Sequence, residues 1–411
     1  MVLLTVIATI LLLGNRATSS HSSTEKINLA VHSDTPEAPP QSSDRFTRVV
    51  IPTGHRPGSI AVADVNHDGN PDIIVANTED ETVSVLLGDG KGHFAPAPGS
   101  PFACGKAPND IAVADMNGDG NPDLVIANTG TPYITILLGD GKGGFAPSPH
   151  SPFATQSYPH VHGVVAADFM GNGKLAVITD SWGHNQILMV PGDGSGNLIL
   201  PGKFFNVGKR PYQRLRSADF NGDGKPDVVT TDIDSNAVTI LLGDGKGGFA
   251  EAAGSPFPAG FAPWSVAIGD INGDGKLDLA ILPYAPDVRD PKDIGVTVLL
   301  GDGNGGFTKM CGSPFSLAGC QGPDRIAIGD VNGDGLNDIV ASCGQNHRVM
   351  LYLGIKGGGF QISTLDAQTG WSGLAVADLL GDGKQEIIVS NGALDEDPKN
   401  LPGTITIFFK K

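Results

Sequence analysis

The chain has 411 residues, of which 40% are hydrophobic, and it carries a formal net charge of −17 at pH 7. This charge argues against a nucleic-acid phosphate backbone as partner, because like charges repel, and it favours the attraction of cations. The 58 glycines and 30 prolines predict many turns and short strands rather than long helices.

Residues 2–13 (VLLTVIATILLL) form an apolar run that small residues follow. The run has the length of a signal-peptide core and is too short to span a bilayer, so we expect residues 1–20 to direct export. A membrane anchor is the alternative interpretation. Residues 21–44 are rich in Ser, Thr and Pro and predict a flexible linker. We therefore expect a secreted protein, extracellular or periplasmic, with no stable membrane span.

From residue 45 to residue 411 one pattern returns seven times, at intervals of about fifty residues, which is a period typical of propeller blades. Each copy is anchored by an aspartate at the end of a short apolar run. These anchors are Asp64, Asp115, Asp168, Asp219, Asp270, Asp330 and Asp378. Each unit reads as four short strands rich in β-branched residues. The first unit predicts strands over 60–64, 72–77 and 82–88 and a fourth strand that begins at residue 93. The fold class is therefore all-β, a seven-bladed β-propeller of four-stranded blades.

The two ends of the repeat region complement each other. The last unit lacks a fourth strand, whereas residues 45–51 (RFTRVVI) form an unassigned strand ahead of the first unit. Placing residues 45–51 as the outer strand of the last blade would close the ring with the N-terminal strand and remove an exposed edge. Residues 45–411 are thus expected to form one propeller domain.

A nine-residue loop, D-x-N-x-D-G-x-x-D, joins the first two strands of five units. Side-chain oxygens at positions one, three, five and nine, with the backbone carbonyl at position seven, suit calcium, a hard cation that takes six to eight oxygens. The predicted ligands are Asp64, Asn66, Asp68, Asn70 and Asp72; Asp115, Asn117, Asp119, Asn121 and Asp123; Asp219, Asn221, Asp223, Lys225 and Asp227; Asp270, Asn272, Asp274, Lys276 and Asp278; and Asp330, Asn332, Asp334, Leu336 and Asp338. We expect about five Ca²⁺ sites with a mainly structural role. The competing interpretation is that these side chains only form Asx-turns.

The third and seventh units depart from the calcium pattern. Met170 and Ala176 replace two ligands in the third unit, so we expect no calcium there. Leu380 replaces one ligand in the seventh unit, which leaves room for weak binding only. Both units keep their glycines, so the loop geometry should persist in them.

The D-x-N-x-D-G-x-x-D loops, together with GDGKGGF turns at residues 139–145 and 243–249, resemble the FG-GAP/VCBS repeat family, which includes the propeller head of integrin α subunits. The resemblance covers residues 45–411. It implies calcium on one face of the propeller and ligand binding by loops on the other face. The family also contains lectins and some polysaccharide lyases, so the fold alone does not name the activity.

Loops before the first strand and after the second strand leave the propeller on the face opposite the calcium loops. These loops carry aromatic, histidine and arginine side chains, which are typical anchors for a protein or a sugar. The candidate ligand-binding residues are His160, His162, Trp182, His184, Tyr212, Arg214, Arg216, Trp264, Tyr284 and Trp371. The alternative is that these side chains pack between neighbouring blades.

Two functions remain open at this point. The preferred one is a binding or adhesion module for an extracellular protein or glycan, acting as a monomer without catalytic residues. The alternative is a propeller-fold polysaccharide lyase, in which His160, His162, Tyr212 and Arg214 would provide base, acid and carboxylate clamp. The sequence contains no G-x-S-x-G elbow, H-E-x-x-H pair or phosphate loop, so common hydrolase chemistries lack support.

The cysteines permit one disulfide in an oxidising compartment. The spacing favours Cys311–Cys320 first and Cys320–Cys343 second, with unpaired thiols as the alternative.

Overall fold

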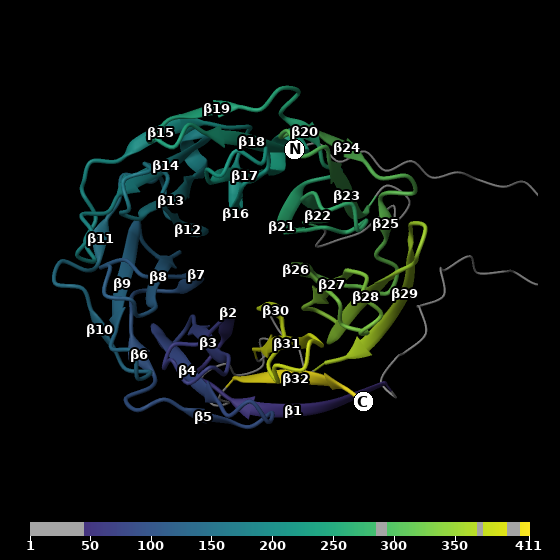
Figure 1. Cartoon of the computed structure of the whole chain (residues 1–411), viewed down its shortest axis with the longest axis horizontal. Helices are drawn as coiled ribbons and strands as arrows, with labels where there is room; N and C mark the ends of the chain where they lie inside the picture. Colours follow the sequence, from purple (N-terminus) through teal and green to yellow (C-terminus); the bar gives the residue numbers. More distant parts are fainter. Residues whose placement is uncertain (1–44, 285–293, 368–372, 393–402) are drawn as a thin grey trace, which may run out of the picture. The chain divides into compact units, whose positions relative to one another are not determined.

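The computed structural model describes residues 45–284, 294–367, 373–392 and 403–411. The expected signal peptide, the expected linker and Trp371 lie outside these described residues. Seven antiparallel sheets of four main strands are arranged in a ring, as the repeat predicts, and the first strand of each sheet lies nearest the centre (Figure 1). Among the described residues, no helix has the length and apolar character needed to cross a membrane.

Blades one to four follow one another along the chain. Blade one contains β2 (Pro57–Ala63), β3 (Asp72–Asn77), β4 (Thr82–Gly88), β5 (Phe94–Pro96) and β6 (Phe102–Ala103). Blade two contains β7 (Pro108–Ala114), β8 (Asp123–Asn128), β9 (Tyr133–Gly139), β10 (Phe145–Pro147) and β11 (Phe153–Ala154). Blade three contains β12 (Val164–Ala167), β13 (Ala176–Ser181), β14 (Gln186–Pro191) and β15 (Lys203–Asn206). Blade four contains β16 (Pro211–Ala218), β17 (Asp227–Asp232), β18 (Ala237–Gly243), β19 (Phe249–Glu251) and β20 (Phe257–Pro258).

Blades five to seven complete the set. Blade five contains β21 (Pro263–Gly269), β22 (Asp278–Pro283), β23 (Gly295–Gly301), β24 (Phe307–Lys309) and β25 (Phe315–Ser316). Blade six contains β26 (Pro323–Gly329), β27 (Asp338–Cys343), β28 (Arg348–Gly354) and β29 (Phe360–Asp366). Blade seven contains β30 (Leu374–Ala377), β31 (Glu386–Asn391) and β32 (Thr404–Lys410), with β1 (Phe46–Pro52) as its fourth strand. Two short 3₁₀ segments, η2 (Trp182–His184) and η3 (Ile233–Ser235), follow β13 and β17.

Four blades contain a short additional strand that the sequence did not predict. In blades one, two, four and five, a two-residue strand pairs with the beginning of the third strand, as β6 does with β4. A Ser-Pro-Phe sequence sets this strand: in blade one, the hydroxyl of Ser100 accepts the backbone N–H of Val85 at 2.9 Å. A strand of two residues has no alternation to reveal it, so only the pairing in three dimensions identifies it.

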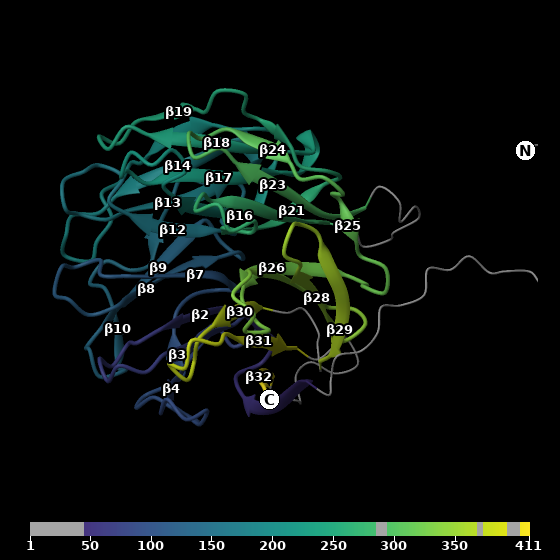
Figure 2. The same ribbon diagram turned by 45° about the vertical axis from the view of Figure 1, so that its right-hand side comes forward.

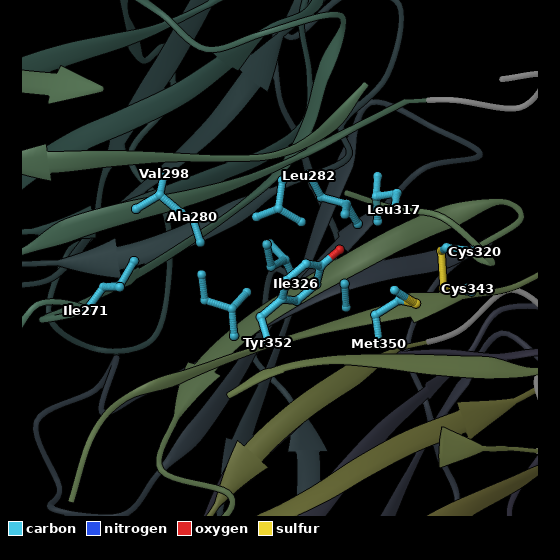
Figure 3. Close-up of a cluster of buried hydrophobic side chains, with 13 residues drawn as sticks. Ile271, Ala280, Leu282, Val298, Leu317, Cys320, Ile326, Cys343, Met350 and Tyr352 are labelled. Carbon is cyan, nitrogen blue, oxygen red and sulfur yellow. A yellow bond between two sulfur atoms is a disulfide. The ribbon is translucent and has the colours of Figure 1, made fainter. Parts of the chain in front are cut away.

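The core lies between neighbouring blades. The second strand of every blade is buried along its whole length, because both faces of its sheet are covered. Figure 3 shows one such layer, in which Leu282 and Val298 of blade five face Ile326 and Tyr352 of blade six. The hydroxyl of the fully buried Tyr352 donates to the carbonyl oxygen of Ser316 at 2.9 Å, which satisfies its polar end.

The fourth strand of blade seven comes from the other end of the chain. β1 pairs with β32 in antiparallel register from Phe46↔Lys410 to Pro52↔Thr404, and both strands lie side by side in Figures 1 and 2. This is the pairing that the sequence led us to expect for residues 45–51. Blade seven also contacts blade one, because the hydroxyl of Ser390 lies 3.0 Å from the carbonyl oxygen of Gly58.

One disulfide is present among the described residues, and it is not the preferred prediction. Cys320 and Cys343 are joined, with their Cα atoms 5.2 Å apart, whereas Cys104 and Cys311 are free thiols. Pro323 at the start of β26 pairs with Cys343 at the end of β27, so the segment just before β26 lies next to Cys343. The predicted Cys311–Cys320 pair was therefore wrong, since sequence proximity does not report strand pairing.

Candidate functional site

The first two strands of each blade carry the two candidate sites at opposite ends. In blade three, Ala167 pairs with Ala176 at the end of the hairpin that holds the aspartate loop. Val164 pairs with Thr179 at the other end, next to the histidines and Trp182. The predicted calcium loops and the predicted ligand-binding residues therefore lie at opposite ends of the blades.

The position-one aspartate holds each loop by the same two hydrogen bonds. In the first loop, the carboxylate of Asp64 accepts the backbone N–H groups of Asp68 at 3.2 Å and Gly69 at 2.9 Å. Gly69 has a φ of +86°, which explains the glycine at position six. The other six anchors make the same pair of bonds: Asp115, Asp168, Asp219, Asp270, Asp330 and Asp378. The third and seventh loops thus keep the common geometry, although they lack predicted ligands.

The position-nine aspartate has a structural role that the sequence did not reveal. Asp72 is fully buried, and its two oxygens accept the backbone N–H groups of Val65 and Gly88, each at 2.9 Å. It therefore connects the loop to the end of the third strand. The same two bonds recur for Asp123, Asp227, Asp278 and Asp338.

The two divergent loops show what happens when this aspartate is replaced. In blade three, where Ala176 stands at position nine, Phe169 N–H donates instead to the carbonyl of Ala167 and Gly192 N–H to that of Leu175, both at 3.0 Å. In blade seven, Glu386 accepts the backbone N–H of Leu379 at 2.8 Å. Both loops find acceptors, so the fold tolerates the substitutions.

The loops contain uncompensated negative charge. Burial first, and then the carboxylates at positions one and five of the same loops, raise the pKa of Asp123 to about 6 and that of Asp338 to about 7, against the opposing effect of their backbone hydrogen bonds. The pKa of Asp72 is raised for the same reasons, burial first. A cation bound in the loop would relieve this repulsion.

Lysines at position seven provide part of the compensation in three blades. The pairs are Lys225 Nζ–Asp223 at 2.9 Å, Lys276 Nζ–Asp274 at 3.8 Å and Lys384 Nζ–Asp382 at 2.8 Å. Position seven is asparagine in blades one and two and leucine in blade six. The loops of blades one, two and six are therefore the ones in which no position-seven lysine competes with a divalent cation.

The donor chemistry of the loops fits calcium, because every predicted ligand atom is an oxygen. Asx-turns are also present: Asp68 N–H donates to the side-chain oxygen of Asn66 at 3.0 Å, and Asn70 N–H to that of Asp68 at 2.8 Å. A carboxylate oxygen has two lone pairs, so such bonds leave acceptor capacity for a cation. Within the described part of the chain, no three His, Cys, Asp or Glu side chains converge as a metal-holding group. Calcium therefore stays a prediction.

Six of the predicted ligand-binding residues form one cluster on the opposite face. This aromatic cluster consists of His160, His162, Trp182, Tyr212, Trp264 and Tyr284. Tyr212 lies at its centre, with ring-centroid distances of 4.1 Å to His162, 5.2 Å to Trp182 and 5.3 Å to Trp264. Tyr284 then stacks on Trp264 at 4.5 Å. Residues from blades three, four and five are thus brought into one continuous layer.

The cluster is partly a packing layer and partly a surface. His162 and Trp264 are buried, so for these two residues the alternative interpretation of packing between blades holds. His160, Trp182 and Tyr212 are half-buried. The cluster therefore has a buried base and an accessible upper layer.

Two exposed aromatic residues extend this surface and were missed in the sequence. Tyr158 is 58% exposed and stacks on His184 at 5.3 Å, and Phe261 is 52% exposed in the loop that precedes Trp264. His184 thus contacts Tyr158 at the edge of the face. Both missed residues lie in loops before a first strand, which is the signal that could have identified them.

Asp180 and two histidines form a hydrogen-bonded chain beneath this surface. His162 Nδ1 lies 3.1 Å from Asp180 Oδ2, and His162 Nε2 lies 3.1 Å from His160 Nε2. Asp180 also accepts the backbone N–H groups of His162 and Gly163. Burial, and then the neighbouring His162, lower the pKa of His160. The carboxylate therefore orients His162, and the half-buried His160 is the member closest to solvent.

The two predicted arginines lie deeper, towards the ring centre. Arg214 Nη1 is 2.7 Å from Asp110 Oδ1, and Arg216 Nη1 is 3.3 Å from Asp110 Oδ2. Asp110 belongs to β7 of blade two, whereas the arginines belong to β16 of blade four. Their contact therefore spans the inner side of blade three.

Comparison with known proteins identifies the repeat. A family described as FG-GAP-like repeat matches residues 64–126, 115–179, 219–281 and 330–389, which together exceed half of the chain. Among solved structures, BBS1N in complex with ARL6DN is 12% identical, with a TM-score of 0.56 over 89% of this chain and 97% of that chain. Virginiamycin B lyase from Staphylococcus aureus is 14% identical, with a TM-score of 0.52 over 89% of this chain and 100% of that chain. At such identities the likeness shows the fold alone. No curated protein matches the sequence.

Proposed function

Because the chain belongs to the FG-GAP-like repeat family, we propose that it is an exported, calcium-binding β-propeller that acts as an adhesion module for an extracellular protein or glycan. The Cys320–Cys343 disulfide supports export, since such bonds persist in oxidising compartments. The absence of a membrane-spanning helix among the described residues is compatible with this location.

The observation that carries the proposal is the surface formed by Tyr158, Phe261 and the half-buried residues of the aromatic cluster, which we call the aromatic face. Tyr158 and Phe261 leave more than half of their surface in solvent. Tyr158 stacks on His184, two residues after Trp182, and Phe261 lies three residues before Trp264. Exposed aromatic rings on a rigid support are typical of interfaces, because they bury a large area at a small entropic cost. The blades provide that support, and the buried rings of His162 and Trp264 fix the layer from below.

Calcium would serve the opposite face. The proposed ligands are the oxygens of the five intact loops. Bound Ca²⁺ would neutralise the neighbouring carboxylates that, after burial, raise the pKa of Asp123 and Asp338. We expect the loops of blades one, two and six to bind most tightly, because no lysine at position seven occupies their carboxylates.

An array of extracellular proteins and glycans, probed with the calcium-loaded protein, tests the binding proposal. The informative variant is Phe261→Ala, and the matched control is Ile355→Ala, since Ile355 is equally exposed but lies in blade six. We expect Phe261→Ala to weaken binding by about tenfold, which corresponds to losing an interface aromatic, while Ile355→Ala binds normally. Equal effects of the two substitutions would reject the aromatic face as the binding surface.

A polysaccharide lyase is the second candidate, and the chain Asp180–His162–His160 favours it. In such a reaction a base removes the C5 proton of a uronate, the C4–O bond breaks, and the leaving oxygen takes a proton. Of the two histidines, only His160 is accessible for this role, because His162 is fully buried. An ultraviolet assay on uronate polymers is decisive: product that disappears in His162→Ala and His160→Ala would overturn the binding proposal.

A further inference from the structure

A charged cluster lies at the centre of the ring, where side chains from non-adjacent blades meet. This arginine cluster consists of Arg214 and Arg216 from blade four, Arg325 and Asp324 from blade six, and Asp110 from blade two. Arg325 Nη1 is 2.5 Å from Asp324 Oδ1, and Trp264 Nε1 donates to the same oxygen at 3.0 Å. The cluster therefore connects directly to the aromatic cluster through Trp264.

One of the two carboxylates of the cluster, that of Asp110, has no capacity left for a further donor. Asp110 Oδ1 accepts from the Ser59 hydroxyl at 3.2 Å and lies against Arg214. Asp110 Oδ2 accepts from the Val164 N–H at 3.2 Å and from Arg216. A carboxylate has about four lone-pair sites, so Asp110 is saturated.

The guanidinium groups remain only partly satisfied. The side chain of Arg214 is 0% exposed, yet its Nε and Nη2 atoms have no hydrogen-bond partner, and neither has Nε of Arg325. Buried polar groups are normally hydrogen-bonded, and a buried guanidinium with free N–H groups is costly. These N–H groups indicate a missing acceptor.

The charge balance of the arginine cluster also indicates that an acceptor is missing. Three guanidinium groups face two carboxylates, which leaves one positive charge in excess inside a protein whose net charge is −17. Burial, and then Arg325, lower the pKa of Arg214 to about 9, so Arg214 stays protonated at neutral pH. Burial opposes the charge on Asp110, but the three guanidinium groups nevertheless hold its pKa below the usual range. The excess positive charge therefore persists at physiological pH.

We infer that the arginine cluster binds an oxyanion, and that a carboxylate group of the ligand is the one it fits best. A guanidinium presents a planar fork that matches a carboxylate with two parallel hydrogen bonds. The inference rests on the proposed function, because the ligand would reach the arginine cluster from the aromatic cluster. Arg214 lies two residues after Tyr212 in β16, and Asn109, next to Asp110, donates its Nδ2–H to the carbonyl of His162 at 3.0 Å. Residues of the two clusters are therefore neighbours. The ligand of the aromatic face would thus be acidic, with its anionic group directed to the ring centre.

Calorimetry on the calcium-loaded full chain tests this inference with D-glucuronate as the carboxylate probe, sulfate as a second oxyanion and glucose as the neutral control. We expect glucuronate to bind and glucose not to bind. Binding should weaken as salt increases, because part of the attraction is screened. Sulfate bound more tightly than glucuronate would support an oxyanion site and assign it to sulfated ligands.

Arg216→Gln is the informative variant, because the side chain of Arg216 is 36% exposed and its loss leaves Arg214 paired with Asp110. Arg348→Gln is the matched control, since its side chain is 29% exposed and its ion pair, with Asp366, joins β28 to β29 in the outer part of blade six. We expect Arg216→Gln to weaken glucuronate binding by about tenfold or more, Arg216→Lys by less, and Arg348→Gln by less than about twofold. Melting curves of all three variants check that they fold.

Two results would overturn the inference. The first is that neither anion binds with a Kd below about 10 mM. The second is that Arg348→Gln weakens binding as much as Arg216→Gln. If neither anion binds while the array ligand is still lost in Phe261→Ala, the oxyanion inference fails and the proposed binding function stands. If glucuronate binds while the array finds no ligand, the oxyanion inference stands and the proposed binding function fails.

Discussion

Replacing a position-nine aspartate should destabilise the propeller even without calcium. Asp227 is fully buried and accepts the backbone N–H groups of Phe220 at 2.8 Å and Gly243 at 2.7 Å. Asp227→Ala removes both acceptors. Asp223→Ala in the same loop removes an exposed carboxylate that binds only neighbours within the loop. Comparing the two separates the structural role of the loop from its proposed calcium role.

The expected cost follows from the two hydrogen bonds. A hydrogen bond to a charged group contributes about 1.5–3 kcal/mol, so the loss of both gives an upper range of about 3–6 kcal/mol. Two observations place the result at the lower end. The loop of blade three satisfies the equivalent N–H groups of Phe169 and Gly192 with backbone carbonyls. Burial raises the pKa of Asp227, so its removal also relieves a desolvation cost. We therefore expect a loss of about 3 kcal/mol in the free energy of unfolding.

Urea denaturation, followed by tryptophan fluorescence, measures this loss in EDTA and again in calcium. Asp227→Ala should unfold at lower urea concentration in both media. Asp223→Ala should match the wild type in EDTA and fall below it only in calcium. If Asp227→Ala and the wild type unfold at the same urea concentration in EDTA, the two buried hydrogen bonds do not stabilise the fold and the reasoning is refuted.

Three further predictions concern the whole chain. EDTA should lower the melting temperature and calcium should restore it; an unchanged melting curve would support loops held by Asx-turns alone. Burial raises the pKa of Asp232 from 3.8 to about 7, so the folded state holds this proton more tightly than the unfolded chain. Stability in EDTA should consequently fall as pH rises from about 4 to about 7, and Asp232→Asn should flatten that fall, which urea titrations across this range would detect. Cys320→Ser should cost about 3 kcal/mol, since the disulfide joins residues 23 positions apart; chemical denaturation that finds no loss would contradict this estimate.

The repeat could be predicted because its signals are local. An apolar run, an aspartate and a glycine in a fixed order specify a strand, a loop and the next strand, and all seven anchors occupy the expected position. The strand ahead of the first unit was also recognisable, because residues 45–51 belong to no unit and the last unit lacks a fourth strand. Positions within one blade are therefore accessible to pattern reasoning.

Contacts between blades were not accessible in the same way. Arg216 and Asp110 are 106 residues apart, and their contact depends on the ring bringing blades two and four together. The second bond of Asp72, to Gly88, likewise depends on where the third strand ends. The aromatic residues were recognised as a set, but which of them are buried depends on the neighbouring blade. Trp264 is covered, whereas Phe261, three residues earlier, is exposed.

The pairing of β1 with β32 has a consequence for biosynthesis. The Thr47 hydroxyl donates to the carbonyl oxygen of Phe409, across a separation of 362 residues. At a translation rate of 5–20 residues per second, about 20–70 s pass between synthesis of the two strands. During that delay β1, with Val49 and Val50 on its surface, is an unpaired edge that invites association with other chains. A nascent molecule therefore cannot complete blade seven until its last strand has emerged.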